Sequence, residues 1–484
     1  MNKRSLMLRR IRRGYSKGLG KIPRKGRIRV ILALGIIAVA VLVLKNRGGR
    51  SGGDSLDTPP PSDSATGKHA AAPSAETDDK TVLRAPRSVG KAEMKHEDVV
   101  ELLRRFPPRL SRTRDTLEFS KHPVVIHYAL DTALQALGRK LFKRYHPKYA
   151  AAVAITPADG RVVGLMSYTR DDVRELEGNL ACRTLFPAAS IFKTVTAAAA
   201  VERGGLAPDT PLKHVGRNHT LYNFQLEKDL ENFTEISLRK AYAYSINPVF
   251  GRIGIFRVGC RLLKEYGARF GFLCNIPFDL ETEISSLNSC DSSFALAELA
   301  SGFNTGTTLS PLLGALLACA ICDNGIIQRP VLVDSITDAG NRKTRYQARP
   351  TPWKSAVSPA TAEALRDLMR SVARFGTARS AFKYVKRSYR FKNIEYGGKT
   401  GSVNKDGLGK VDWFTGFARH PSDTAQRLAV AVVTVHGAYW TVHSSFLGAE
   451  IIRHRLRNIQ IAREKKQAVV DSLKRAETDS AESG

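Results

Sequence analysis

Ser190 and Lys193 are the residues of this sequence whose types and spacing best suit a nucleophile and its base. The residues that follow, 194–201, are almost wholly apolar and predict a buried helix. Because side chains three positions apart lie on one face of a helix, the Lys193 amine could take the proton of the Ser190 hydroxyl. The pair therefore predicts covalent catalysis by an activated serine.

The Ser-x-x-Lys spacing alone carries little weight, because the chain contains five matches to it. They begin at Ser88, Ser190, Ser237, Ser380 and Ser402. The Ser190 match is distinguished by its position at the start of a predicted buried helix. A simpler interpretation stays open, since serine is a common N-cap residue that begins helices without doing chemistry.

Ser245 and Asn247 form a second candidate pair. A hydroxyl beside a nucleophile can pass a proton to a leaving amine, and an amide side chain can hold a peptide carbonyl. However, Ser-x-Asn also occurs at Ser286 and Ser402. The end of a helix before Pro248 would explain the segment equally well.

The third candidate is the segment 397–402, Gly-Gly-Lys-Thr-Gly-Ser, which contains the only Lys-Thr-Gly of the chain. On a strand edge, paired glycines would let a substrate backbone approach, and Lys399 and Thr400 could bind a carboxylate. A phosphate-binding loop would need an earlier glycine at the position that Asn393 occupies. A carboxylate site is therefore favoured.

The elements that must position these residues indicate an α+β fold. Apolar residues recur at helical spacing over 130–145, and 185–380 is mostly helical in pattern. Four strand-like runs lie on either side of this helical region, the first two joined by a hairpin signal. They are 151–155, 161–168, 413–418 and 428–435. We predict an antiparallel sheet built from both ends of the domain, with flanking helices and an inserted helical subdomain.

Taken together, the three motifs resemble the Ser-x-x-Lys, Ser-x-Asn and Lys-Thr-Gly signature of β-lactamases and penicillin-binding proteins. Other stretches are similar to penicillin-binding proteins as well: Gly164–Ser167, Leu185–Ser190, Asn324-Gly325 with Pro330, Gly376-Thr377-Ala378 and Asp412–Gly416. Residues 130–460 are thereby identified as a penicillin-binding transpeptidase domain, with a short segment at 96–129 before it and a charged tail at 461–484 after it.

The resemblance implies that Ser190 attacks the carbonyl between two terminal D-alanines of a peptidoglycan stem peptide. Lys193 would be its base and must therefore be neutral. Burial and the nearby charge of Lys399 would lower the pKa of Lys193 in the required direction. No cofactor and no metal are implied, and no histidine is given a role.

The remaining site residues are also carried over from the resemblance. Ser245 would pass the proton to the departing D-alanine, and Asn247 would hold the donor amide. Thr400, together with the lysine before it, would bind the terminal carboxylate, and Gly401 belongs to the same substrate-binding strand. The backbone N–H groups of Ser402 and of the nucleophile would form the oxyanion hole.

The acyl-enzyme could be resolved by an amine, giving a D,D-transpeptidase, or by water, giving a D,D-carboxypeptidase or a β-lactamase. Class A β-lactamases use a glutamate followed four residues later by an asparagine. Here Glu283 is followed by Asn288, five residues on, which argues against a β-lactamase. A catalytically silent receptor for β-lactams or wall fragments is a further alternative, although none of the catalytic residue types is missing.

The N-terminal part predicts a membrane anchor. Residues 1–29 hold twelve Lys and Arg and no acidic residue, and 30–44 has no polar side chain. We predict a basic cytoplasmic segment at 1–29, a transmembrane signal-anchor at 30–45 and a disordered linker at 46–95. The catalytic domain would then lie on the periplasmic, extracytoplasmic side of the inner membrane.

The net charge of +31 favours anionic partners. The densest basic run adjoins the predicted anchor, so anionic lipid explains it and no nucleic acid is expected. The expected partners are stem peptides, their lipid-linked precursor, β-lactams and other wall-synthesis proteins. Six cysteines permit disulfides in an exported domain. Cys319 and Cys322 lie in an apolar helix-like run, which predicts buried packing rather than a metal site.

Overall fold

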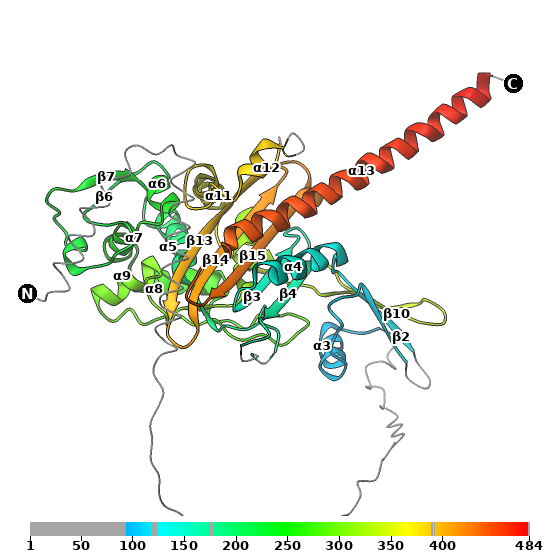
Figure 1. Cartoon of the computed structure of the whole chain (residues 1–484), viewed down its shortest axis with the longest axis horizontal. Coiled ribbons are helices and arrows are strands. Elements are labelled where there is room, and N and C mark those ends of the chain that lie inside the picture. Colours follow the sequence, from blue (N-terminus) through cyan, green and yellow to red (C-terminus); the bar gives the residue numbers. More distant parts are fainter. Residues whose placement is uncertain are drawn as a thin grey trace, which may run out of the picture. The chain divides into compact units, whose positions relative to one another are not determined.

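The structure, a computed structural model shown in Figure 1, describes residues 93–118, 123–173, 176, 178–388, 391 and 393–482. These residues belong to the second of two units, Thr81–Gly484. The predicted basic segment, the predicted anchor at 30–45 and the linker as far as residue 92 lie outside the described residues. Among the described helices, none has both the length and the apolar character needed to cross a membrane.

A five-stranded antiparallel sheet forms the centre of the second unit, in the order β13-β14-β15-β3-β4. Its strands are β3 (Tyr149–Ile155), β4 (Val162–Thr169), β13 (Glu395–Lys405), β14 (Gly409–Arg419) and β15 (Arg427–His436). The predicted hairpin is confirmed as β3 and β4, and the two late strand runs fall within β14 and β15. The sheet is therefore assembled from both ends of the domain, because β15 pairs with β3.

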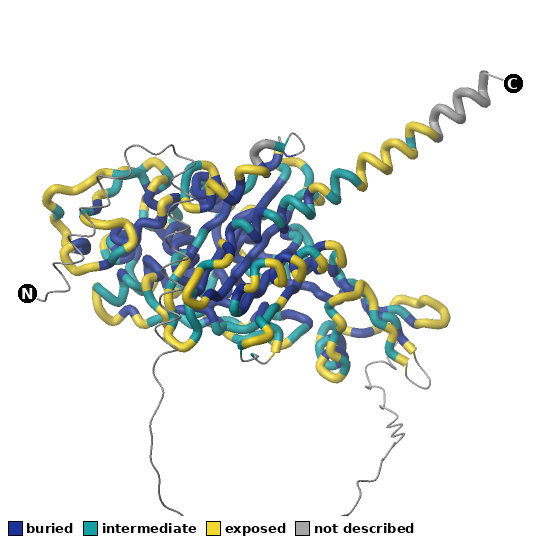
Figure 2. The backbone as a smooth tube through the Cα atoms, viewed as in Figure 1, coloured by how far each residue is buried: buried dark blue, intermediate teal, exposed yellow. Residues whose placement is uncertain are grey.

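Helices cover both faces of the sheet, so that Figure 2 shows it as a buried centre. α10 (Pro311–Cys322) and α11 (Pro359–Arg374) pack on one face, while α4 (Thr132–Tyr145) and α13 (Ser444–Glu482) pack on the other. Local sequence fixes where these helices begin. The Asp131 carboxylate accepts from the Leu134 N–H at 3.0 Å, and the Ser310 hydroxyl accepts from the Leu313 N–H at 3.1 Å.

The inserted region is mainly helical, as predicted, but it also contains short strands. Its helices are η3 (Ala189–Phe192), α5 (Lys193–Glu202), η4 (Asn223–Gln225), α6 (Leu238–Ala243), α7 (Asn247–Ile253), η5 (Gly254–Val258), α8 (Gly259–Arg269) and α9 (Ser293–Ser301). Its strands are β5 (Phe186–Pro187), β6 (Pro211–His214), β7 (Thr234–Ser237), β8 (Thr308–Leu309), β9 (Ile326–Gln328) and β12 (Pro352–Ser355). The short helix α12 (Lys383–Arg387) lies before β13, and η7 (Thr424–Gln426) lies between β14 and β15.

A second, four-stranded sheet joins the segment 96–129 to the rest of the unit. It has the order β1-β2-β10-β11, with β1 (Arg114–Leu117), β2 (Val124–Tyr128), β10 (Val333–Asp338) and β11 (Thr344–Gln347). The helix α3 (His96–Arg105) is joined as well, because the His96 imidazole contacts the Asp279 carboxylate at 3.0 Å. The segment before residue 130 is thus paired with residues more than 200 positions further along the chain.

The C-terminal helix α13 is longer than the sequence pattern predicts. A charged tail was predicted at 461–484, and the helix continues through most of it, to Glu482. Leu456 is buried, and most residues from Glu464 to Asp471 are exposed (Figure 2). The first half of α13 therefore belongs to the core and the second half does not.

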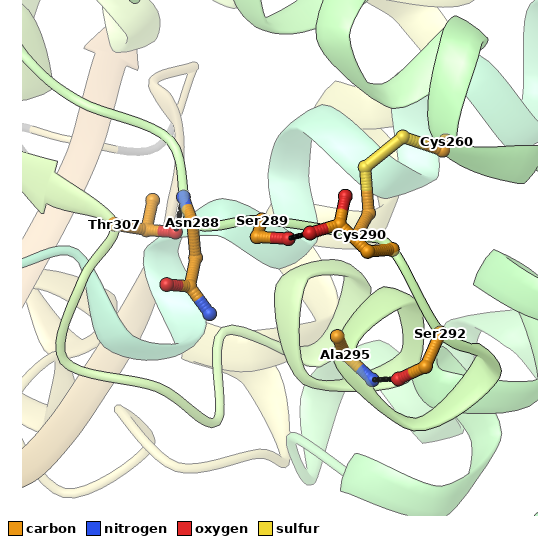
Figure 3. The surroundings of a disulfide bond; sticks show 8 residues. Cys260, Asn288, Ser289, Cys290, Ser292, Ala295 and Thr307 are labelled. Carbon is orange, nitrogen blue, oxygen red and sulfur yellow. Dashed lines mark hydrogen bonds between the residues drawn. A yellow bond between two sulfur atoms is a disulfide. The ribbon is translucent and has the colours of Figure 1, made fainter.

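One disulfide joins Cys260, in α8, to Cys290, which precedes α9 (Figure 3). Ser292, two residues further on, caps α9 by accepting from the Ala295 N–H at 3.1 Å. Cys319 and Cys322 are free and buried within α10, where every residue is buried. Burial raises the pKa of the Cys322 thiol to about 12, which suits an inert packed side chain.

Candidate active site

Ser190 lies in the 3₁₀ turn η3, directly before α5. Ala189 has a φ of 49°, a left-handed conformation that is uncommon for alanine and turns the chain sharply before the serine. The N-cap of α5 is Phe192, so the interpretation of Ser190 as a simple N-cap residue is wrong. Ser190 is partly exposed, whereas the next turn of the helix is buried.

Lys193 has no exposed surface, and its amine has three oxygen neighbours. The Nζ atom lies 2.8 Å from Ser190 Oγ, 2.7 Å from Asn247 Oδ1 and 2.5 Å from the Ser301 carbonyl oxygen. A neutral amine has two protons and one lone pair. The amide and carbonyl oxygens accept the two protons, which leaves the lone pair directed at the Ser190 hydroxyl.

The environment of Lys193 favours this neutral form. Burial, and then the charge of Lys399, hold the pKa of Lys193 well below its ordinary value. The described residues around the amine include no carboxylate among its hydrogen-bond partners. The structure thus agrees with the direction of the pKa shift that the sequence analysis expected.

Ser245 and Lys399 form a second buried pair. Lys399 has no exposed surface, and its Nζ donates to Ser245 Oγ at 2.9 Å and to the Thr400 carbonyl at 2.8 Å. Burial lowers the pKa of Lys399 to about 7. Ser245 has a φ of 57°, so its side chain is presented from a left-handed turn immediately before α7.

The glycines of β13 have roles different from the one expected. A Cβ on Gly397 would lie 2.5 Å from the Met369 carbonyl carbon of α11, and one on Gly398 would lie 2.5 Å from the Phe414 ring. These two glycines therefore allow packing inside the domain rather than the approach of a substrate. A Cβ on Gly401 would lie 3.1 Å from the backbone nitrogen of Ser190, so this glycine lets β13 pass close to the nucleophile.

The structure brings the predicted site residues together from three parts of the chain. Ser190 and Lys193 come from η3 and α5, Ser245 from the turn before α7 and Asn247 from the first residue of that helix, and Lys399 to Ser402 from β13. Thr400 is partly exposed and Ser402 is exposed, so both can meet a ligand.

Three residues at the site were not assigned roles from the sequence. The Ser301 carbonyl contacts Lys193, the Thr377 and Thr400 hydroxyls lie 2.5 Å apart, and His219 lies near enough to Lys193 and Lys399 to feel their charges. Partial desolvation and the two lysines lower the pKa of His219. The Gly-Thr-Ala stretch offered a signal for Thr377, whereas no pattern indicated the other two.

Glu283, the position compared with the deacylating glutamate of β-lactamases, is held by other groups. Its carboxylate accepts from the Thr184 N–H at 2.7 Å and from the Thr184 hydroxyl at 3.1 Å, and it pairs with Arg183. Asn288 donates its backbone N–H to the Thr307 hydroxyl at 3.1 Å. A carboxylate engaged in this way supports the loop in which it lies rather than activating a water.

The site contains a serine 2.8 Å from a buried lysine whose pKa is lowered, a second hydroxyl beside another lysine, and a strand that passes next to the serine. This combination has the parts that a serine acyltransferase centre needs. Within the part of the chain that the structure describes, no group of three or more His, Cys, Asp or Glu side chains could hold a metal.

Comparison with known proteins gives the family. Residues 150–453 match the family described as penicillin binding protein transpeptidase domain. The chain therefore belongs to the penicillin-binding protein transpeptidase family, as the three motifs indicate.

Two curated relatives are similar over much of the same region. The chain is 28% identical over 328 residues to the peptidoglycan D,D-transpeptidase PbpA of Mycobacterium tuberculosis, covering 61% of this chain and 63% of that protein. It is 26% identical over 308 residues to the stage V sporulation protein D of Bacillus subtilis, covering 58% of this chain and 44% of that protein. The chain thus spans less than two thirds of either relative.

Solved structures share the fold. The D,D-transpeptidase domain of a peptidoglycan glycosyltransferase from Eggerthella lenta has a TM-score of 0.57 at 25% identity, covering 69% of this chain and 83% of that one. An imipenem acyl-enzyme complex of penicillin-binding protein A from Mycobacterium tuberculosis has a TM-score of 0.55 at 22% identity, covering 68% and 78% respectively.

Proposed function

We propose that this protein is a D,D-transpeptidase that cross-links peptidoglycan stem peptides and is acylated by β-lactams. The observation that carries the proposal is the three-oxygen environment of Lys193, with contacts of 2.8, 2.7 and 2.5 Å. It leaves the amine one acceptor site, and that site faces the Ser190 hydroxyl. Family membership and the name of the first relative support the choice of substrate.

In the proposed acylation, Lys193 takes the Ser190 proton while Oγ attacks the carbonyl between two terminal D-alanines. The developing oxyanion lies between the backbone N–H groups of Ser190 and Ser402, where β13 passes closest to the nucleophile. Ser245, held by Lys399 at 2.9 Å, relays the proton that Lys193 has taken up to the amine of the leaving D-alanine, so that both side chains return to their starting forms. An acyl-enzyme and free D-alanine result.

The substrate carboxylate would lie beside the middle of β13, at Thr400. The adjoining hydroxyl of Thr377 provides a second donor, and Lys399 provides positive charge when a carboxylate is present. The side-chain oxygen of Asn247 accepts a hydrogen bond from Lys193. The NH₂ group of Asn247 is therefore the part that can donate to the carbonyl of the donor amide.

Transpeptidation is proposed in preference to hydrolysis, because Glu283 is engaged with Thr184 and Arg183. We further propose that residues 30–45 anchor the enzyme in the inner membrane and that the catalytic domain lies outside the cytoplasm. The apolar run at 30–44 after twelve basic residues supports this placement. The lipid-linked precursor would then be within reach.

The function is tested with a stem peptide ending in D-Ala-D-Ala and a primary-amine acceptor. We expect release of D-alanine and formation of the peptide–amine product, both lost in Ser190→Ala. Release of D-alanine with water as the sole acceptor would show a carboxypeptidase instead. An absence of release by the folded protein would favour a silent receptor.

A further inference from the structure

The loop 215–226, called here the aromatic loop, borders the active site. The Asn218 carbonyl accepts from the Asn247 N–H at 2.7 Å. The next residue, His219, is exposed. The loop is therefore joined to the Ser-x-Asn motif at Asn247.

The aromatic loop is held in shape by one buried amide. Gln225 has no exposed surface, and its Nε2 donates to the Val215 carbonyl at 2.9 Å. Its Oε1 accepts from the Tyr222 N–H at 3.0 Å and from the Thr220 hydroxyl at 3.2 Å. An amide bonded at both ends to the same loop fixes the loop's conformation before any ligand arrives.

The inner side of the aromatic loop packs on the helical region. Leu221 and Leu226 are 3% and 8% exposed and form a small separate cluster with Ala297 of α9. A Cβ on Gly251 of α7 would lie 2.9 Å from Leu226, so the packing is close. The apolar side chains of the loop thus divide into an anchored inner set and an outer set.

The outer set consists of Tyr222 and Phe224, which are 55% and 52% exposed. Their rings are stacked, with centroids 5.9 Å apart and an interplanar angle of 14°. Asn223 between them is exposed, and Figure 2 shows the region around β6 and β7 as largely exposed surface. Two large rings that a fixed loop holds outside the core offer a preformed apolar surface to a ligand.

We propose that Tyr222 and Phe224 form a binding site for an N-acetylhexosamine ring of the glycan that carries the stem peptide. This inference rests on the proposed function. A hexose ring presents C–H bonds on its face, which pack on an aromatic ring, while its hydroxyl and acetamido groups need polar partners at the edge. Asn218, His219 and Asn223 are exposed on the same loop and supply these partners.

A membrane surface is the rival occupant, because exposed aromatic rings also enter lipid interfaces. The glycan is favoured by continuity with the active site. The Asn218 carbonyl accepts from the Asn247 N–H, so a peptide held at Asn247 extends toward this loop with its sugar carrier.

The test compares two substrates with the full chain: a free stem peptide, and the same peptide on an N-acetylhexosamine disaccharide. In the double variant Tyr222→Ala/Phe224→Ala we expect KM for the disaccharide peptide to rise about tenfold, roughly the strength of one aromatic contact. KM for the free peptide and the rate of penicillin acylation should not change. Equal changes for both peptides, or no change for either, would overturn the inference.

Two matched variants control for folding and for exposed rings in general. The exchange Tyr222→Phe/Phe224→Tyr keeps both rings and should keep the preference for the disaccharide peptide. Tyr384, 63% exposed on α12, provides the control Tyr384→Ala, which should behave as wild type.

The membrane alternative is decided with Tyr222→Cys in a Cys274→Ser background, labelled by a polar thiol reagent. Protection by tetra-N-acetylchitotetraose supports the sugar site, and protection by phosphatidylglycerol bicelles alone refutes it. Failure of the proposed function looks different, because neither peptide would then be turned over by the wild-type chain.

Discussion

At the scale of single residues, the chemistry depends on the protonation of two buried lysines. Lys193 faces three oxygens and Lys399 faces two, and neither has a carboxylate among these partners. Burial therefore lowers the pKa of each lysine, and the charge of Lys399 lowers the pKa of Lys193 further.

The variant Lys399→Gln should shift the pH dependence of acylation. Lys193 acts as a base when neutral, so acylation is fast above its pKa and is lost as the pH falls below it. Removing the neighbouring positive charge raises the pKa of Lys193, which moves the acid limb of the profile to higher pH. The measurement is the penicillin acylation rate from pH 5 to 10. An acid limb at the wild-type position would contradict the electrostatic coupling.

Thr377→Val should weaken binding of the substrate carboxylate. The Thr377 hydroxyl lies 2.5 Å from that of Thr400, and valine keeps the shape while removing the donor. Losing one hydrogen bond to a charged group should raise KM for a D-Ala-D-Ala peptide about tenfold or more. Thr377→Ser, which keeps the hydroxyl, is the matched control and should bind as wild type. An unchanged KM in the valine variant would remove Thr377 from the site.

The side chains that meet at the candidate site could be chosen from the sequence, because their types occur in three ordered motifs. The Ser301 carbonyl could not, since every residue has one and only the fold brings this one to Lys193. The roles of Gly397 and Gly398 were predicted wrongly for a related reason. Gly397 packs against Met369 of α11 and Gly398 packs against Phe414 of β14, and only the fold brings these residues together.

At the scale of elements, the disulfide ties α8 to the start of α9, whose last residue supplies the Ser301 carbonyl. Cys260→Ser/Cys290→Ser should lower the free energy of unfolding by about 3 to 4 kcal/mol, as expected for a closed loop of roughly 30 residues. Denaturant unfolding measures this. Cys274→Ser, at a free cysteine, is the control and should change stability little. Equal stabilities of the double variant and the control would show that the disulfide contributes nothing.

Elements whose residues are close in sequence were the easier ones to predict. The hairpin of β3 and β4 has its turn in the sequence, and α10 has a helix-length apolar run. The pairing of β2 with β10 has no such signal. The two strands are about 200 residues apart, and apolar and polar residues alternate only weakly in their sequences. Short strands such as β5 and β8 are set by tertiary contacts and not by their own composition.

At the scale of the whole molecule, α13 shows where the folded core ends. Arg455 pairs with Asp131 at 2.6 Å and Leu456 is 1% exposed, whereas residues after Arg463 are mostly exposed. A chain that stops after Lys466 should keep the wild-type melting temperature within about 2 °C, since exposed residues contribute little. A chain that stops after Arg453 loses Leu456 and the Asp131 contact, and it should melt several degrees lower. Equal melting temperatures of the two truncated chains, followed by circular dichroism, would contradict this boundary.

Three sequence motifs meet at one site, and the proposed function requires that Ser190 of this site becomes acylated. The most direct measurement is intact-protein mass spectrometry of the full chain mixed with penicillin and sampled over time. We predict a mass increase of one penicillin that persists for hours in the wild type and is absent in a folded Ser190→Ala variant. Undiminished labelling of Ser190→Ala would contradict the assignment of the nucleophile, and an adduct that clears within seconds would contradict the preference for transpeptidation.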